Sequence, residues 1–378
     1  MGEAALPDDS LRVLVVDDSA LYRQLVRNVL LDIAGVEVVG LAKSGQEALD
    51  QVDRLAPDLL TLDVRMPGVD GLGVLRELKR RRSRPRAIML SSLTANGAQV
   101  TTDALLEGAF DFIHKPAGPD AEINRRTLRQ ALAEKLQAFR DSRAGRGFVR
   151  TAGTDIKRAE PTGRGLPSGR GDHATAAQPP TSEYEAVVIA TSTGGPVALR
   201  QVLPLLPGDL PVPVLIVQHM PAQYTHSLAV RLNEASQIEV VEACDGMALE
   251  PGWAFIAPGG RQMKVVRRGG KCLIAITDDP PENGCRPSAD YLFRSAAEVY
   301  DGKVLAVVMT GMGHDGTQGC RELKRKGALV IAQHPEGCVV YGMPKAIVDE
   351  QLADRIVPLE RIAGVVSMRV RSPREKGK

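Results

Sequence analysis

The sequence lacks any long apolar segment: no uninterrupted run approaches the ~20 residues that a membrane-spanning helix needs, and no basic and apolar leader opens the chain. Its five cysteines are odd in number and form no Cys-x-x-Cys pair, which favours a reducing compartment over a disulfide scaffold. Lysine and arginine exceed aspartate and glutamate by only 48 − 46 = 2, so no overall positive field points to nucleic acid. We therefore expect a cytoplasmic protein that binds no nucleic acid and does not insert directly into a membrane.

Aromatic residues are also scarce, at 3% of the 378 residues, whereas glycine and proline number 37 and 25. A chain of this length can form two domains with separate cores. Few aromatics and many turn residues suit an α/β architecture with strands of valine, isoleucine and leucine.

Short apolar segments alternate with helical patterns across the first part of the chain. This alternation predicts a doubly wound, five-stranded parallel sheet, so residues 10–140 are expected to form one α/β domain. The predicted strands are residues 11–16, 36–42, 59–62, 87–90 and 110–113, and the predicted helices are residues 21–30, 45–55, 71–79 and 98–107.

The alternation stops at residues 141–183, which are rich in glycine, arginine, proline, serine and threonine. We interpret this stretch as a flexible linker. Alternation then resumes, and residues 184–370 are predicted to form a second doubly wound, mainly parallel α/β domain. Its predicted strands are residues 185–190, 212–218, 238–242, 254–257, 263–266, 273–277, 304–310, 329–332 and 356–359, with helices at 196–206, 288–300 and 317–326.

Acidic residues follow two predicted strands of the first domain. Asp17 and Asp18 come directly after the first strand, and Asp63 follows the third. Because functional groups gather at the carboxyl ends of parallel strands, we expect these carboxylates in one cleft. Carboxylates this close repel one another unless a divalent cation holds them, and oxygen ligands suit Mg²⁺. With the cation neutralising developing charge, Asp63 could attack a phosphoryl donor.

Two further strand ends supply Ser91 and Lys115, both placed to contact a phosphoryl oxygen. Taken singly, an aspartate at a strand end is more often a helix cap or a turn residue. As an ordered set, however, residues 10–135 resemble the response-regulator receiver family. Its acidic pair, phospho-accepting aspartate, serine switch, aromatic switch and Lys-Pro are matched by Asp17, Asp18, Asp63, Ser91, Phe112 and Lys115. The resemblance implies Mg²⁺ as cofactor, with the backbone carbonyl of Arg65 as a further ligand, and a sensor histidine kinase as phosphodonor.

A second constellation lies in the C-terminal half. Ser192 sits between a predicted strand and a helix that begins near Pro196, where backbone N–H groups and the helix dipole favour a developing oxyanion. A serine nucleophile needs a base, and His219 follows the next strand directly, so it is the leading candidate among six histidines. Asp315 lies in a glycine-rich turn after the strand 304–310 and can orient the histidine. Taken singly, these residues would more often be an N-cap, a core histidine and a turn residue.

Longer motifs surround these residues, and residues 184–370 resemble the chemotaxis protein-glutamate methylesterase domain. The motifs are Ser192-Thr-Gly-Gly, Gln218-His219-Met220-Pro221, Ala257-Pro258-Gly259-Gly260, Arg286-Pro287-Ser288-Ala289-Asp290, Gly311-Met312-Gly313-x-Asp315-Gly316 and Gly342-Met343-Pro344. The resemblance implies that Ser192, His219 and Asp315 act as nucleophile, base and orienting carboxylate, with the backbone of Met312 contacting the oxyanion. It also implies methyl-accepting chemotaxis receptors as substrates, glutamine deamidation as a related activity, and no cofactor in the catalytic domain.

Together these patterns predict a phosphorylation-controlled methylesterase whose unphosphorylated receiver obstructs access to Ser192. Two other classes compete with this interpretation. One is a response regulator whose second domain binds a partner without hydrolysis. The other is a transcription factor, which the absence of a helix-turn-helix pattern and of a basic face disfavours. Ester hydrolysis by residues 184–378 alone would discriminate between these classes.

Overall fold

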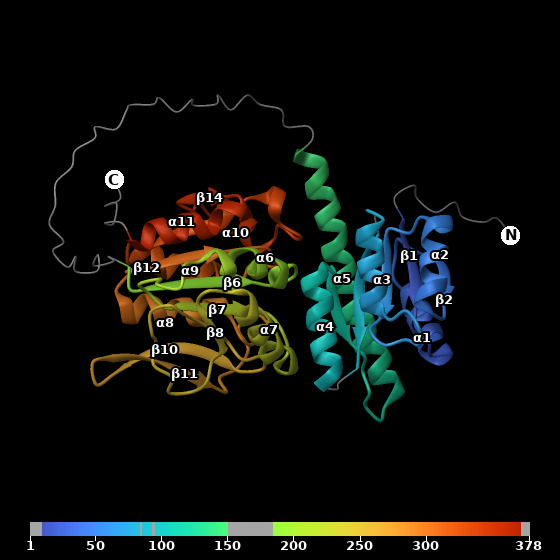
Figure 1. The fold of residues 1–378 in the computed structure, drawn as a ribbon, viewed down its shortest axis with the longest axis horizontal. Coiled ribbons are helices and arrows are strands. Elements are labelled where there is room, and N and C mark those ends of the chain that lie inside the picture. Colours follow the sequence, from blue (N-terminus) through green and yellow to red (C-terminus); the bar gives the residue numbers. More distant parts are fainter. Residues whose placement is uncertain (1–9, 84, 93–94, 150–183, 372–378) are drawn as a thin grey trace, which may run out of the picture.

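The computed structural model describes residues 10–83, 85–92, 95–149 and 184–371. They form two α/β lobes that lie side by side (Figure 1). The predicted linker residues 150–183 lie outside the described residues. None of the described helices combines the length and the apolar character that crossing a bilayer requires.

The N-terminal lobe is a five-stranded parallel sheet in the order β2-β1-β3-β4-β5, with helices on both faces. Its strands are β1 (Leu11–Val16), β2 (Val36–Ala42), β3 (Leu59–Asp63), β4 (Arg86–Ser91) and β5 (Asp111–His114), and its helices are α1 (Ala20–Leu31), α2 (Gly45–Leu55), α3 (Gly71–Arg80), α4 (Ala95–Glu107) and α5 (Ala121–Val149). Central strands such as β3 are buried along their whole length, because helices cover both faces. Ser19, Ser44 and Asp70 cap α1, α2 and α3 by accepting a first-turn N–H. The predicted doubly wound sheet is confirmed.

Helix α5 continues past residue 141, the predicted start of the flexible linker. Residues 141–149 are helical instead. Tertiary contacts near this point favour the longer helix: Phe139 packs edge-to-face on Phe110 at 5.3 Å between ring centroids, and Arg143 pairs with Asp58 at 2.8 Å. Composition alone indicated a coil there, because the partners of these residues are distant in sequence.

The C-terminal lobe is a seven-stranded parallel sheet in the order β14-β13-β12-β6-β7-β9-β8, with a separate antiparallel hairpin of β10 and β11. Its strands are β6 (Ala186–Thr191), β7 (Val214–Gln218), β8 (Glu239–Glu242), β9 (Trp253–Ile256), β10 (Gln262–Arg268), β11 (Lys271–Thr277), β12 (Val304–Val308), β13 (Leu329–Gln333) and β14 (Arg355–Val357). Its helices are α6 (Gly195–Val202), η1 (Leu203–Leu205), α7 (Ala222–Ala235), α8 (Ala289–Tyr300), α9 (Thr317–Arg325), η2 (Pro335–Gly337), α10 (Met343–Asp349) and α11 (Leu359–Arg371). The predicted mainly parallel α/β lobe is confirmed.

One predicted strand of this lobe was placed too far along the chain. Residues 356–359 were expected to be a strand, but β14 ends at Val357 and α11 begins at Leu359. Leu359, Ile362, Ala363 and Val366 are buried at helical spacing, which a four-residue apolar segment did not reveal. The helices α5, α7, α10 and α11 were not predicted.

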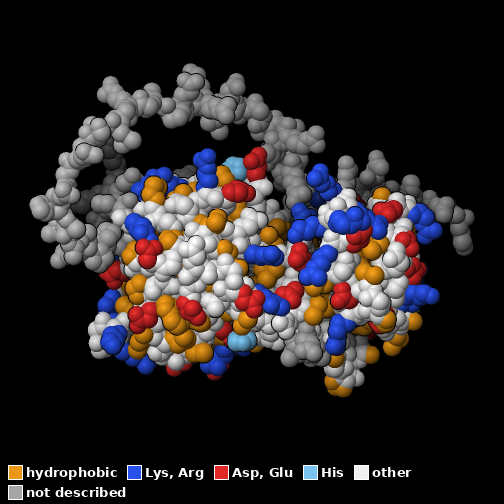
Figure 2. Space-filling model, in the orientation of Figure 1, with side chains coloured by type: hydrophobic (Ala, Val, Ile, Leu, Met, Phe, Trp, Pro, Cys, Tyr) orange, Lys and Arg blue, Asp and Glu red, His pale blue; other side chains and the backbone are white. Residues whose placement is uncertain are grey.

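Helix α4 of the first lobe packs against α6 and α7 of the second (Figure 1). Arg231 of α7 binds Asp103 of α4 in a bidentate pair, with Nε–Oδ1 and Nη2–Oδ2 distances of 2.8 and 3.0 Å. Leu105 of α4 belongs to the same continuous set of buried apolar side chains as Met220 and Tyr224 of the second lobe. Figure 2 shows acidic and basic side chains gathered where the lobes meet. The two lobes therefore share both an apolar and an ionic contact.

Candidate functional site

Ser192 lies in the turn between β6 and α6, at the carboxyl edge of the C-terminal sheet. The side chain of Gln218, at the end of β7, clamps this turn: its Oε1 accepts from Thr191 Oγ1 at 2.6 Å, and its Nε2 donates to the Ser192 carbonyl at 3.0 Å. A Cβ at Gly195 would lie 1.9 Å from that Oε1. Glycine is therefore required at this position by the approach of Gln218.

Thr310, which follows β12, holds the other side of the turn. Its backbone carbonyl accepts the Ser192 N–H at 3.0 Å, and its hydroxyl donates to the Thr193 carbonyl at 2.9 Å. Gly194 has a φ of 80°, and a Cβ there would lie 2.5 Å from Val339. The serine is thus fixed on a rigid turn rather than on a free loop.

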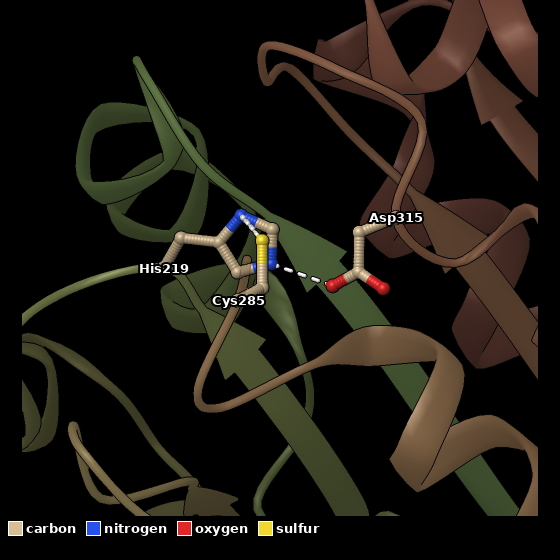
Figure 3. A group of neighbouring side chains, drawn as sticks. All are labelled: His219, Cys285 and Asp315. Carbon is tan, nitrogen blue, oxygen red and sulfur yellow. Dashed lines mark hydrogen bonds and ion pairs between the residues drawn. The ribbon is translucent and has the colours of Figure 1, made fainter. Parts of the chain in front are cut away.

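His219 follows β7 and meets Asp315, which comes from the turn after β12 (Figure 3). His219 Nε2 lies 2.7 Å from Asp315 Oδ2. The second ring nitrogen, Nδ1, lies 3.8 Å from Cys285 Sγ. Two strand ends of one parallel sheet have therefore brought together residues that are 96 positions apart.

The Asp315 carboxylate sits at the N-terminus of α8, where several donors converge on it. Its Oδ1 accepts from Ser288 Oγ at 2.8 Å and from the Asp290 N–H at 3.0 Å, and its Oδ2 accepts from the Ala289 N–H at 2.7 Å. The helix dipole adds to these hydrogen bonds, because helix N-termini favour negative charge. The side chain is only 2% exposed, so these donors replace the water that an ionised carboxylate would otherwise bind.

These contacts move the pKa values of the pair in opposite directions. Burial lowers the pKa of His219, but its interactions with Asp315 and Cys285 outweigh burial and raise that pKa to about 9. Burial raises the pKa of Asp315, but His219 and the backbone N–H groups hold it below its usual range. The neighbouring Asp290 differs: burial raises its pKa to about 6.

Ser192 and His219 line one small cavity of about 20 Å³, together with the first-lobe residues Asp111, Phe112 and Lys135. That volume holds about one water molecule. In the described structure, no hydrogen bond joins the Ser192 hydroxyl to the His219 ring, although their backbones meet where His219 N–H donates to the Thr191 carbonyl at 3.1 Å. First-lobe side chains therefore narrow the space beside Ser192.

Three contacts join the two lobes near this cavity. Asp111 of β5 accepts a hydrogen bond from Thr193 Oγ1 at 2.5 Å and pairs with Lys135 Nζ at 2.8 Å. Next to it, the centroid of the Phe112 ring lies 4.5 Å from that of the Tyr224 ring of α7. Met312 is half-buried and packs against the apolar cluster of the first lobe. Among the described residues, its backbone N–H donates to no protein acceptor.

In the N-terminal lobe, the structure brings together the acidic residues expected there. One ligand oxygen from each of Asp17, Asp18 and Asp63 lies within 4.8 Å of the others. Lys115 Nζ bridges two of these carboxylates, at 2.6 Å from Asp17 Oδ2 and 2.9 Å from Asp63 Oδ1. Burial raises the pKa of Asp63, and Lys115 opposes that rise. A set of oxygen donors with one opposing ammonium group has the chemistry of a hard-cation site.

The remaining predicted receiver residues surround this cluster. Ser91 is fully buried at the end of β4, and its hydroxyl accepts from Thr101 Oγ1 at 2.7 Å. Arg65 lies in the loop after β3, where its side chain extends to Ser92 Oγ at 3.5 Å. Phe112 is directed to the second lobe, as described above. Phosphoryl contacts of Ser91 and Lys115 remain predictions.

Comparison with known proteins identifies both lobes. The family model for CheB methylesterase matches residues 187–366, and that for the response regulator receiver domain matches residues 13–133. A protein-glutamate methylesterase/protein-glutamine glutaminase from Desulfotalea psychrophila is 48% identical over 94% of this chain and 97% of its own length. One from Alkalilimnicola ehrlichii is 42% identical over 93% of this chain and 97% of its own length. This chain belongs to the protein-glutamate methylesterase/protein-glutamine glutaminase family.

Membership in the methylesterase family makes this chain an ester hydrolase that carries a response-regulator receiver domain. Among solved structures, the Thermotoga maritima CheB methylesterase catalytic domain is 41% identical, with a TM-score of 0.48, and the match covers 49% of this chain and 98% of that domain.

Sequence reasoning about this methylesterase-family chain missed several contacts. Gln218 and Ser288 were noted only as parts of motifs, although they hold the Ser192 turn and Asp315. Cys285 was counted with the other cysteines, yet it faces the His219 ring. Its position directly before the Arg-Pro-Ser motif was the available indication, because that motif begins α8, whose N-terminus holds Asp315.

Proposed function

We propose that this chain hydrolyses the γ-methyl esters of glutamates on methyl-accepting chemotaxis receptors and deamidates glutamines, with Ser192 as the nucleophile. The observation that carries the proposal is the 2.7 Å pair of His219 and Asp315 in the cavity that Ser192 lines. This pairing supports a Ser-His-Asp mechanism, in which geometry and role define the residues rather than their order in the chain.

The contacts support separate roles for the two ring nitrogens of His219. With Asp315 ionised, His219 Nε2 carries the proton of their hydrogen bond, and Nδ1 is the nitrogen that can take the Ser192 proton. The free N–H of Met312 can donate to the oxyanion as the ester carbonyl becomes tetrahedral. His219 then gives the Ser192 proton to the leaving methoxide, which departs as methanol, and a water molecule activated by His219 releases the acyl group. This chemistry needs no cofactor in the catalytic domain.

The N-terminal lobe is proposed to be the phospho-acceptor, with Asp63 as the attacked residue. Asp17, Asp18, Asp63 and the Arg65 carbonyl would hold Mg²⁺, which neutralises phosphoryl charge when bound. The proposal that these residues bind Mg²⁺ is supported by the carboxylate oxygens, which lie within 4.8 Å of one another. Ser91 and Lys115 would contact phosphoryl oxygens, and a sensor histidine kinase would supply the phosphoryl group.

The proposed working units are residues 10–140 as receiver and 184–370 as catalytic domain. Family membership and the five free cysteines support a cytoplasmic site of action on receptors. Because the receiver leaves about 20 Å³ beside Ser192, we infer that the unphosphorylated form is held at low activity. Phosphorylation would shift the equilibrium toward an arrangement that admits the receptor.

The test is methanol release from a methylated receptor. The full chain is assayed with and without a small phosphodonor, beside residues 184–378 alone and the full-length variant Ser192→Ala. The phosphorylated chain and the isolated segment should exceed the unphosphorylated chain, and Ser192→Ala should release no methanol while still taking up phosphoryl groups. Methanol release by Ser192→Ala would refute the assigned nucleophile. Binding of the receptor without any hydrolysis would favour a partner-binding regulator instead.

A further inference from the structure

The second nitrogen of His219 faces a thiol. Cys285 Sγ lies 3.8 Å from His219 Nδ1, and Figure 3 shows the contacts to Cys285 and Asp315 leaving the imidazole from different nitrogens. Ligand atoms from His219, Cys285 and Asp315 all lie within 4.8 Å of one another. The proposed hydrolytic mechanism uses the imidazole and the carboxylate but assigns nothing to the thiol.

The spacing of the nitrogen and the sulfur suits a single metal ion. Zn²⁺ binds imidazole nitrogen at about 2.0 Å and thiolate sulfur at about 2.3 Å. Two such ligands at a tetrahedral angle are about 3.5 Å apart, close to the 3.8 Å between Nδ1 and Sγ. To share one ion, the Cys285 side chain and the ring would also have to turn so that Sγ approaches the Nδ1 lone pair.

The other ring nitrogen, Nε2, has the partner that metal-bound histidines usually have. A ligating histidine commonly donates its second ring N–H to a carboxylate, which fixes the tautomer and makes the metal-binding nitrogen a better ligand. Asp315 Oδ2 at 2.7 Å from Nε2 is placed to accept that hydrogen bond. Backbone donors from α8 hold the carboxylate itself.

We propose that His219 Nδ1 and Cys285 Sγ form a reversible site for a borderline-soft divalent cation such as Zn²⁺. Asp315 orients the imidazole, and water fills the remaining positions. Binding releases the thiol proton, and any proton on Nδ1, to solvent. Because the cation occupies the Nδ1 lone pair, it inhibits the hydrolase. Inhibition rests on the proposed role of His219 as base, whereas metal binding does not.

This site differs in chemistry from the acidic cluster of the receiver. Asp17, Asp18 and Asp63 offer oxygen ligands, which suit Mg²⁺, whereas His219 and Cys285 offer nitrogen and sulfur. Excess Mg²⁺ should therefore saturate the receiver without protecting the hydrolase from zinc. Cys244, which is exposed, provides a matched control thiol.

The experiment uses the full chain in excess Mg²⁺, with Co²⁺ as a spectroscopic probe for the zinc site. Wild type and Cys244→Ser should show a thiolate-to-cobalt charge-transfer band, and Cys285→Ser should not. Asp315→Asn should weaken Co²⁺ binding roughly 10- to 100-fold, as loss of a carboxylate behind a ligating histidine does. A wild-type band that survives in Cys285→Ser, or the absence of any such band in wild type, would overturn the site.

Zn²⁺ titration of methanol release gives the second readout, with each variant compared with its own metal-free rate. The zinc concentration for half inhibition should rise at least about tenfold in Cys285→Ser, in line with loss of a metal ligand, and stay unchanged in Cys244→Ser. Equal zinc sensitivity in both variants would overturn the inhibitory role. If the chain releases no methanol at all, the proposed hydrolase function is wrong. The cobalt spectrum still decides whether the metal site exists.

Discussion

The two lobes treat buried carboxylates in opposite ways. In the receiver, Asp17 and Asp63 share one side-chain partner, the ammonium group of Lys115, and burial leaves the pKa of Asp63 raised. In the catalytic lobe, backbone N–H groups at the start of α8 hold Asp315, and its pKa is lowered. A lysine can move aside when a phosphoryl group or a cation arrives, but backbone amides cannot leave. The first arrangement suits a switch and the second suits a preorganised active site.

The largest effect is expected at Asp63, the proposed phospho-acceptor of the receiver. Asp63→Asn removes the proposed nucleophile but keeps the shape of the side chain, so labelling by a small phosphodonor should disappear while the lobe stays folded. Phosphoryl uptake by the variant is measured beside its circular dichroism spectrum. Undiminished labelling of a folded Asp63→Asn protein would contradict the assignment of Asp63.

Asp315→Asn tests the preorganised site. An amide cannot accept on both sides as the carboxylate does, so it leaves His219 in the wrong tautomer or misaligned. We expect the turnover number for methanol release to fall roughly 10⁴-fold, as in a serine protease with the same exchange. Asp290→Asn is the matched control, because Asp290 is also buried but does not contact His219. If both variants lost the same fraction of the turnover number, the contact with His219 would not explain the effect of Asp315→Asn.

A smaller effect is expected at the contact between the lobes. Arg231→Glu reverses one side of the bidentate pair with Asp103 and should favour the open arrangement. The unphosphorylated chain should then hydrolyse its substrate about tenfold faster, which corresponds to about 1.4 kcal/mol. Arg325→Ala removes an ion pair with Glu322 on α9 and serves as a control. If both variants keep the wild-type rate, the Arg231–Asp103 contact does not hold the cleft closed.

The smallest expected effect is a displacement of the pH profile. His219 acts as a base only when neutral, and its pKa is raised to about 9. The basal rate of the unphosphorylated chain should therefore rise with pH, by about tenfold per unit below that value, and level off above it. Cys285 is one of the groups that raise this pKa, so Cys285→Ser should move the midpoint to lower pH. The rate is measured from pH 6 to about 10; a midpoint that does not move would show that the thiol leaves the imidazole unaffected.

The sequence predicted the receiver sheet well because each strand is a short apolar segment between clear helices. For example, β1 was predicted at residues 11–16 and is observed there. The convergence of Ser192, His219 and Asp315 on one sheet edge also followed from strand order, although their catalytic roles stay predictions. Which ring nitrogen faces Asp315 could not be predicted, since it depends on the position of α8. Cys285 and Thr193 were missed for the same reason: their contacts are set by tertiary packing between segments distant in sequence.

Strand β5 carries both ends of the proposed switch within a few residues. Asp111 and Phe112 contact the catalytic lobe, and Lys115 directly after the strand contacts Asp63. If phosphorylation at Asp63 releases this contact, thermodynamic reciprocity requires that occupation of the catalytic cleft favour phosphorylation by the same factor. A ligand bound beside Ser192 would then shift the equilibrium toward the phosphorylated, open arrangement. The catalytic cleft and the phosphorylation site would therefore be allosteric effectors of each other, each stabilising the open arrangement that the other favours.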